Sequence, residues 1–463
     1  MVYLTQRRVK MHATDLETGE ISPKDAKFIK KHTSTLIAFG EFIDGYDLAV
    51  IGVAMVFLSS SFSLTPADKG LLVAISFIGT AVGLIFFGDL SDRIGRKKVF
   101  AFNLWVFIVT AILAGAITQV WMLWVLRFLI GVAIGMDLST SSAYLAEIAP
   151  KARRGRITGS LLNIMLVLGA MFAILLAMAL YAVVPEAHYD WIWRGMFVFA
   201  AIPAAIVLLL RKKLPESPRW LIQNGETEKA WKIIRALGLE DEMKEVRPRK
   251  TNREYRKLFH GDARRRVLVC TAFFMLNSTA GPVVSFLGPV IFAEAGVPAS
   301  ANLLISLLAN VVAFLALFIG AYFIDRVNRR NLGLITAAIL TVVAAVLGLM
   351  GALSNVILFA AFVIWSFTTY FGPGMLALVW SVEAYPTELR GFGAGFTQSM
   401  ARVMSATVSF LVPVLVAKYG YYAIAPFSLV YLLMFILVWA NPWLASTAES
   451  LEDVAEGKLA ETK

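Results

Sequence analysis

The chain has 463 residues, of which 58% are hydrophobic, and its mean hydropathy is +0.71. A water-soluble domain of this length does not need so much apolar sequence for its core, so the composition excludes an ordinary soluble protein and indicates a membrane protein. The formal net charge of +11 does not indicate nucleic-acid binding, because the Lys and Arg residues gather in short polar segments between long apolar runs.

Residues 1–32 are polar and charged and contain no apolar stretch typical of a signal peptide. We therefore expect a cytoplasmic N-terminal segment, with the first membrane helix directing insertion. About twelve apolar runs follow, each long enough to cross a hydrocarbon layer of roughly 30 Å as a helix. The predicted spans are 33–59, 71–90, 98–119, 121–146, 156–184, 194–210, 265–294, 301–324, 331–351, 354–382, 391–417 and 421–443.

The basic segments 92–98, 150–156, 211–266 and 325–330 all fall on one side of the membrane if the chain crosses it at each predicted span. Loops rich in Lys and Arg mark the cytoplasmic side. We therefore predict a multi-pass protein of the plasma (cytoplasmic) membrane with both termini in the cytoplasm.

The first span contains the stretch FGEFIDGYDLAVIG, which places Glu41, Asp44 and Asp47 in an otherwise apolar helix. One Asp at the centre of a bilayer costs roughly 2.5–3.5 kcal/mol on insertion scales, so three acids indicate a function. At 100° per residue they lie within an arc of about 120°, and Asp44 and Asp47 lie near the midplane. We expect this polar stripe to face a hydrated cavity, although Asp47 alone is also compatible with a structural hydrogen bond.

Other spans place polar side chains at a similar depth, roughly 15–18 Å from the inner surface. Such groups inside a membrane protein are typical of a substrate pathway. The candidate substrate-binding residues are Asp137, Arg402, Asn277, Asn163, Tyr370 and Gln398.

The two halves of the chain repeat each other. Residues 144–159 and 380–395 share the pattern E-x-x-P-x-x-x-R-G, and 88–98 matches 321–331 around an Asp-Arg pair. Each pair occupies the same ordinal place in its half, which indicates a duplicated bundle. The sequence therefore predicts an all-α membrane protein with twelve transmembrane helices in two pseudo-symmetric six-helix bundles. The predicted domains are an N-terminal bundle at 33–210, a cytoplasmic linker at 211–264, a C-terminal bundle at 265–443 and a cytoplasmic tail at 444–463.

In the linker, Pro215 is expected to end the sixth helix, and Thr227 to Leu237 is expected to form a short helix.

These repeated motifs, together with WRGMF (193–197) and PESPRWL (215–221), resemble the sugar-porter-type branch of the major facilitator superfamily over most of the chain. The resemblance implies that fold, a central cavity lined by helices 1, 4, 7 and 10, a monomer, and a proton gradient in place of any cofactor. It also implies cytoplasmic charge networks that close an inner gate, although basic residues there also serve membrane orientation. The implied gate residues are Asp92, Arg93, Arg96, Glu147, Arg154, Asp325, Arg326, Arg329, Glu383 and Arg390.

The same resemblance implies that Asp47 accepts the coupling proton and pairs with Arg127 on the fourth helix, with help from Asp44 and Glu41. Burial favours the protonated acid and a nearby arginine favours the carboxylate, so a movable pair can bind and release a proton. The alternative for Arg127 is that its side chain reaches to the membrane surface.

The substrate is less clear from the sequence, because the amide-rich run that reads sugar hydroxyls on helix 7 of sugar porters is largely absent around Leu276 and Asn277. Helices 1, 4, 10 and 11 also resemble phosphate, aromatic-acid and organic-anion proton symporters, with Asp137 and Arg402 at matching places. A guanidinium near the midplane favours an anion, unless it bridges to Asp137 or Asp44. We expect import of an organic acid or other anion, with a monosaccharide as the alternative.

The sequence is also compatible with other classes of protein. A proton-coupled exporter uses the same carboxylates, and a transport-dead nutrient sensor is a further alternative, although the tail after Pro442 is short. An enzyme is not expected, since no H-E-x-x-H or G-x-S-x-G motif is present. The single cysteine, Cys270, excludes a multi-cysteine metal site, and we expect no metal. The distribution of charge gives no reason to expect a nucleic-acid partner. The expected partners are a small molecule, protons and the lipid bilayer.

Overall fold

The computed structural model describes residues 23–148, 160–240, 260–279, 288–294, 297–324, 326–350, 355–383, 385 and 390–445. These residues form helices and connecting turns, with no strand among them. The first half contributes α2 (Pro23–Phe62), α3 (Pro66–Ile94), α4 (Arg96–Gly115), α5 (Val120–Ile148), α6 (Leu162–Val183), α7 (Asp190–Phe199) and α8 (Ala201–Arg211).

The linker forms α9 (Pro218–Gln223) and α10 (Thr227–Leu237), so the predicted helix at 227–237 is confirmed. The second half contributes α12 (Gly261–Asn277), α13 (Gly288–Glu294), α14 (Ala299–Phe323), α15 (Arg329–Met350), α16 (Asn355–Phe371), α17 (Pro373–Glu383), α18 (Arg390–Tyr419) and α19 (Phe427–Trp439). Short 3-10 turns lie at 186–188, 420–424 and 442–445.

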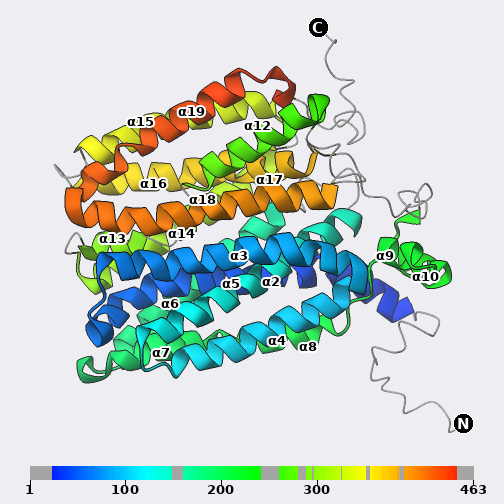
Figure 1. The fold of residues 1–463 in the computed structure, drawn as a ribbon, viewed down its shortest axis with the longest axis horizontal. Coiled ribbons are helices and arrows are strands. Elements are labelled where there is room, and N and C mark those ends of the chain that lie inside the picture. The colour runs from blue at the N-terminus through cyan, green and yellow to red at the C-terminus, as the bar shows by residue number, and fades with distance from the viewer. Residues whose placement is uncertain are drawn as a thin grey trace, which may run out of the picture.

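The long helices run side by side in two groups, one from each half of the chain (Figure 1). The groups meet where α3 packs against α18, and Ser399 Oγ donates to Ala81 O across this contact at 3.1 Å. Helices α6 and α14 make a second contact between the halves. Helix α2 is largely buried, whereas α18 lies at the contact between the two groups with one side exposed.

Eleven of the described segments are long and apolar enough to cross a membrane. The seventh predicted span, 265–294, is described as α12 and α13 on either side of residues 280–287, so neither part reaches the required length alone. The helix boundaries differ from the prediction at the first span, because α2 begins at Pro23, ten residues before the expected start at 33. Hydropathy does not detect this extension, since its residues are polar.

Local sequence explains where α3 begins and ends. Thr65 accepts a hydrogen bond from Asp68 N, and the Asp68 carboxylate accepts one from Thr65 N, so the two residues form a capping box, with Pro66 at the first helical position. Gly95 ends the helix with φ of 100°, a conformation that favours glycine, and allows α4 to start at the next residue.

Glycines allow the helices of the first bundle to approach closely. A Cβ at Gly131 would lie 2.1 Å from Ser76 O, and one at Gly135 would lie 2.3 Å from Thr80 O, so α5 lies directly on the backbone of α3. Gly45 makes the corresponding contact between α2 and α6, where a Cβ would lie 1.8 Å from Leu166 O. The small residues at 131 and 135 therefore serve helix packing.

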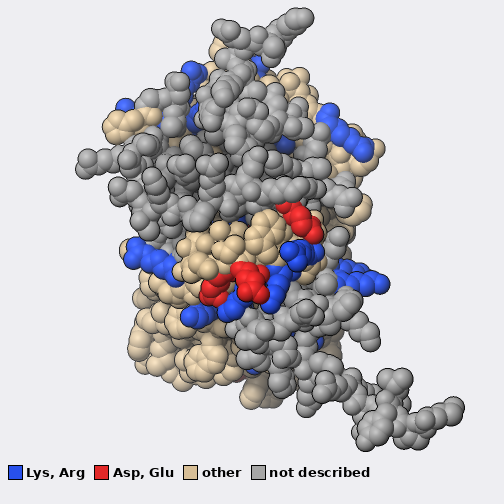
Figure 2. Space-filling view, turned by 90° about the vertical axis from the view of Figure 1, so that its right-hand side faces the viewer, with Lys and Arg blue, Asp and Glu red and all other residues tan. Residues whose placement is uncertain are grey.

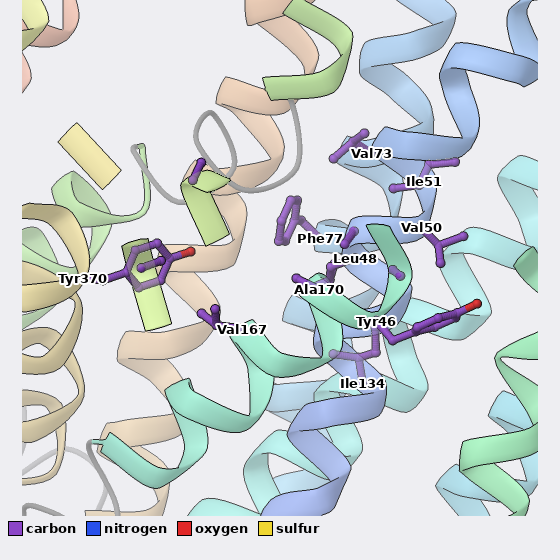
Figure 3. Packing of buried hydrophobic residues seen from close by; sticks show 14 of the residues in the cluster. Tyr46, Leu48, Val50, Ile51, Val73, Phe77, Ile134, Val167, Ala170 and Tyr370 are labelled. Carbon is purple, nitrogen blue, oxygen red and sulfur yellow. The ribbon is translucent and has the colours of Figure 1, made fainter. Parts of the chain in front are cut away.

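The apolar core of the first bundle surrounds this crossing (Figure 3). Tyr46, Leu48, Ile134, Val167 and Ala170 pack together from α2, α5 and α6, while Tyr370 comes from α16 in the other bundle. A second cluster at the end of the first bundle joins α10 to it, because Ile233 and Ile234 pack with Ile37 and Tyr144. The amphipathic linker helix is thus docked on the bundle by its apolar face.

Figure 2 looks onto this end of the molecule, where Lys and Arg side chains lie around the surface and acidic side chains lie among them. Lys229 of α10 pairs with Glu226, just before the helix, at 2.7 Å, and Lys232 pairs with Glu228 at 3.4 Å. These exposed pairs contribute little to stability, so the buried apolar face of α10 holds it in place.

Candidate functional site

The three acids of the first span are all buried on α2, with 2%, 4% and 2% of Glu41, Asp44 and Asp47 exposed. Although they share one side of the helix, they have different surroundings. Asp47 is paired with a cation, whereas one oxygen of Glu41 and one of Asp44 have no hydrogen-bond partner. The predicted single stripe is therefore divided into a paired acid and two unpaired acids.

Asp47 and Arg127 form an ion pair in the interior of the first bundle. Arg127 Nη1 lies 2.7 Å and 2.8 Å from the two carboxylate oxygens of Asp47. Arg127 is fully buried, so it does not reach to the membrane surface. Its Nε and Nη2 atoms have no hydrogen-bond partner, which leaves this cation dependent on a single carboxylate. The contact implied by the resemblance is present, and its role in proton coupling stays a prediction.

Asp137 forms a second buried ion pair, with Arg211 at the end of α8. Arg211 Nη1 and Nη2 both donate to the Asp137 carboxylate, the latter at 3.1 Å. Asn103 Nδ2 and Ser141 Oγ donate to the same carboxylate at 2.7 and 3.1 Å. This contact depends on Gly40, because a Cβ there would lie 1.8 Å from Asp137 Oδ2.

Arg211 also binds the backbone of α2, since it donates to Leu36 O at 3.3 Å and Ile37 O at 2.6 Å. Its guanidinium lies 4.2 Å from the ring centroid of Phe100 on α4. One buried pair thus connects α2, α4, α5 and α8, which favours a structural role for Asp137 over the substrate-binding role predicted from the sequence. Sequence reasoning missed Arg211 because it begins the basic run RKK, which is typical of membrane orientation.

Arg402 on α18 is half-buried and lies 5.8 Å from the ring centroid of Phe77 on α3. Among the described residues no carboxylate lies within 4.0 Å of it, so the alternative left open by the sequence, a bridge to Asp137 or Asp44, is not formed. The charges that act on it most strongly are Glu41 and Asp44 on α2. The guanidinium therefore interacts with the opposite bundle electrostatically, without a direct ion pair.

The remaining predicted substrate residues lie on four helices. Gln398 is buried one turn before Arg402, and its Oε1 has no hydrogen-bond partner. Asn277 is half-buried at the end of α12, and its Oδ1 also has none. Asn163 on α6 is half-buried and Tyr370 on α16 is buried. Two amide oxygens of the second bundle are therefore available to accept hydrogen bonds from a ligand.

The predicted gate residues of the first half make a compact network. Arg96 lies 3.0 Å from Glu147, and Ser217 Oγ donates to the same carboxylate. Glu216 accepts from the backbone N–H groups of Arg96 and Lys97 at 2.9 and 3.3 Å, so it caps α4 from the linker. Tyr144 adds a hydrogen bond to Pro215 O at 2.7 Å. The linker segment 215–217, which the gate prediction did not include, holds α4 and α5 together.

Burial raises the pKa of Glu216 above its ordinary value of 4.5, and the backbone N–H groups of Ser217, Arg96 and Lys97 act in the opposite direction. Glu216 lies outside the membrane-spanning helices, so protons of the adjacent solution reach this end of the bundle.

The other gate residues are less connected in the described structure. Arg93 is exposed, Arg326 lies 3.8 Å from the ring centroid of Tyr322, and Arg329 donates to Ile324 O at 3.5 Å. Arg154 and Asp325, and the side chains of Asp92, Glu383 and Arg390, lie outside the described residues. The duplicated gate of the second half therefore stays a prediction. Among the described residues there is also no group of three or more His, Cys, Asp or Glu that fits a metal ion.

The structure has two helical bundles, buried ion pairs between helices of the first bundle, and a polar network at one end. These features define a membrane transporter of the major facilitator type. The profile of the family described as "Sugar (and other) transporter" matches residues 33–454. The chain belongs to this family, and its resemblance to sugar-porter-type transporters is confirmed.

Related proteins of known sequence include the arabinose-proton symporter of Bacillus subtilis, 28% identical over 88% of this chain and 90% of that protein. The inner membrane metabolite transport protein YgcS of Escherichia coli is 30% identical over 91% of this chain and 93% of that protein. Among solved structures, the proton:xylose symporter XylE bound to 6-bromo-6-deoxy-D-glucose superposes with a TM-score of 0.80 at 20% identity, covering 93% of this chain and 99% of that one. This similarity confirms the predicted fold.

Proposed function

We propose that this protein is a proton-coupled symporter that imports a small neutral sugar or sugar-like metabolite by alternating access. The observation that carries the proposal is the fully buried Asp47–Arg127 pair inside the first bundle of a chain of this family. Arg127 has one carboxylate partner, Asp47, and its Nε and Nη2 atoms have no hydrogen-bond partner. When Asp47 takes up a proton, the negative charge that neutralises Arg127 is lost. Protonation therefore changes the balance of forces between α2 and α5, which couples the proton to helix movement.

The anion expected from the sequence is not supported, and the sugar alternative fits better. Relatives named for their cargo include an arabinose-proton symporter and a glucose transporter, and the structural neighbour is a xylose symporter. The Asp47–Arg127 and Asp137–Arg211 pairs are each neutral, which leaves Glu41 and Asp44 against Arg402. These three groups sum to −1 when both acids are ionised, to 0 when one is protonated and to +1 when both are. Arg402 therefore does not by itself require an anionic cargo.

The second bundle supplies neutral groups for a polyhydroxy ligand. The unpartnered amide oxygens of Gln398 and Asn277 accept hydrogen bonds from hydroxyl groups, and the half-buried Asn163 carries a further amide on α6. This set replaces the amide-rich run of helix 7 that the sequence lacks. A buried amide that forms its hydrogen bond only with a ligand discriminates against molecules that lack the matching hydroxyl.

The gate network then closes one side of the site. Arg96, Glu147 and Ser217 hold helix ends together through hydrogen bonds that can break and form again as the bundles rock. In this proposal the network lies on the cytoplasmic side of the plasma membrane, both termini are cytoplasmic, the protein works as a monomer and no cofactor is used.

The test is proton movement by proteoliposomes that contain the purified protein, in potassium buffers without sodium, with separate panels of pentoses, hexoses and organic anions. We expect alkalinisation of the outer solution with a sugar and none with the anions. Arg402→Gln should change the apparent KM for the sugar without abolishing transport, because the arginine balances Glu41 and Asp44 and is not the site of an anion. A signal with an anion alone, lost in Arg402→Gln, would restore the organic-anion hypothesis.

A further inference from the structure

A small cavity lies inside the first bundle beside Asp44. It is lined by Gly40 and Asp44 of α2, Asn103 of α4 and Asp137 of α5, together with apolar side chains of the same helices. Its size suits about one water molecule or one small ion. Neither the Asp47–Arg127 pair nor the amides of the second bundle line this cavity, so the proposed function does not use it.

Two oxygen atoms around the cavity have no hydrogen-bond partner. Asp44 is 4% exposed and its Oδ2 is unpartnered, and Asn103 is 2% exposed with its Oδ1 unpartnered. The orientation of the Asn103 amide follows from its neighbour, because Nδ2 donates to Asp137 Oδ1 at 2.7 Å. A carboxylate attracts the amide nitrogen, so the carbonyl oxygen faces away from Asp137. Both unpartnered oxygens are acceptors, and a ligand that satisfies them must be a donor or a cation.

The charges at the cavity indicate which of these it is. Asp137 is neutralised by Arg211, whereas no cation of the described residues lies within 4.0 Å of Asp44. A water molecule bridging the two oxygens would leave an ionised Asp44 buried and uncompensated, which is costly. Either a proton or a cation removes that cost, and a cation also satisfies the Asn103 oxygen. Oxygen ligands suit hard cations, and a net charge of −1 matches a monovalent one.

We propose that this cavity is a sodium site, with the ion held by the Asp44 carboxylate and the Asn103 amide oxygen. The site goes beyond the proposed function, because it requires neither the sugar nor the Asp47–Arg127 pair. Sodium and a proton compete for Asp44, so sodium binding weakens as pH falls. The charged groups that face Asp44 are Glu41 and Asp47 on its own helix, Asp137 on α5 and Arg211 on α8, and Arg402 acts on it from α18.

The first experiment compares ions on the wild-type protein in detergent at pH 8. Thermal unfolding is followed in NaCl, KCl and choline chloride at equal ionic strength, and equilibrium binding of radioactive sodium gives the stoichiometry. We expect a saturable rise of the melting temperature with sodium only, about one ion per chain, and a weaker apparent affinity at pH 6. Equal melting temperatures in the three salts, with no bound sodium, overturn the proposal whatever the variants do. That outcome leaves Asp44 as a proton site only.

The second experiment assigns the ion to the cavity. Asp44→Asn removes the charge and Asn103→Leu removes the amide oxygen, so each should abolish the sodium-dependent shift. Glu41→Gln is the matched control, since it removes another buried carboxylate of α2 that does not line the cavity, and it should retain the shift. If Asp44→Asn binds sodium as the wild type does, the ion lies elsewhere. Because the sugar assay uses buffers without sodium, failure of one proposal is distinguishable from failure of the other.

Discussion

The two bundles have the same architecture but differ in their buried polar groups. In the described spans of the first bundle, away from the helix ends, lie Glu41, Asp44, Asp47, Arg127 and Asp137, joined by Arg211 from the end of α8. In the described spans of the second bundle, away from the helix ends, the one charged residue is Arg402. Its interior instead contains hydroxyl and amide groups.

Several of those neutral groups bond to each other or to the backbone, whereas the amide oxygens of Gln398 and Asn277 have no partner. Ser366 Oγ donates to Ala309 O at 2.8 Å, Asn302 Nδ2 donates to Pro289 O at 2.7 Å, and Trp365 Nε1 donates to Tyr431 Oη at 2.8 Å. The first bundle contains buried ionisable side chains, and the second contains neutral polar groups. This difference is consistent with the neutral cargo that we propose.

The largest difference in stability between the two bundles is expected from Asp137→Ala, which leaves Arg211 buried without its carboxylate partner. Breaking a buried ion pair from one side costs about 3–5 kcal/mol of unfolding free energy. Thermal unfolding of the protein in detergent measures the loss. The matched control in the second bundle is Ser366→Ala, which removes one neutral hydrogen bond worth about 1 kcal/mol. If the two variants lose the same stability, the charge pair does not hold the first bundle together.

Asp47→Asn is expected to uncouple transport. With one proton per sugar, each unit of pH gradient supports about tenfold accumulation, since 1.4 kcal/mol is a factor of ten. The variant should only equilibrate the sugar, because its side chain cannot take up the proton, while exchange of labelled for unlabelled sugar continues. Proteoliposomes with an imposed pH gradient measure both activities. Gradient-driven accumulation by Asp47→Asn would move the coupling site to another acid.

Gln398→Ala tests the second bundle. Loss of one hydrogen bond to the sugar, about 0.5–1.5 kcal/mol, should raise the KM by roughly 2- to 12-fold without changing the proton-to-sugar ratio. Initial rates of uptake at varied sugar concentration, together with the proton flux, give both quantities. A changed ratio would show that the second bundle also takes part in coupling.

The smallest effect is expected at Glu216, where burial raises the pKa above 4.5. Between 4.5 and the raised pKa the folded protein holds this proton and the unfolded chain does not, so the free energy of unfolding falls as pH rises through that window. Glu216→Gln should make this dependence less steep, because the amide does not titrate. Melting temperatures between pH 4.5 and 7 measure the slope, and an unchanged slope would assign it to other groups.

The fold and part of the candidate site could be predicted from the sequence. Hydropathy and the duplicated motifs predicted the bundles, and the acids on the first span could be recognised because charge inside a membrane is costly. The Asp47–Arg127 contact followed from resemblance. The substrate class did not follow, because Arg402 favoured an anion, whereas relatives named for their cargo include an arabinose-proton symporter and a glucose transporter.

The sequence by itself determined that this chain is a two-bundle membrane transporter, because apolar length and repeated spacing are properties of the chain alone. Only the tertiary structure decided which charges are paired. Arg211 is 74 positions and Asn103 34 positions from Asp137 in the chain, yet both donate hydrogen bonds to the Asp137 carboxylate, which lies against Gly40. Helix packing sets such contacts, and the electrostatic environment of each acid depends on which side chain lies within a few ångströms of it.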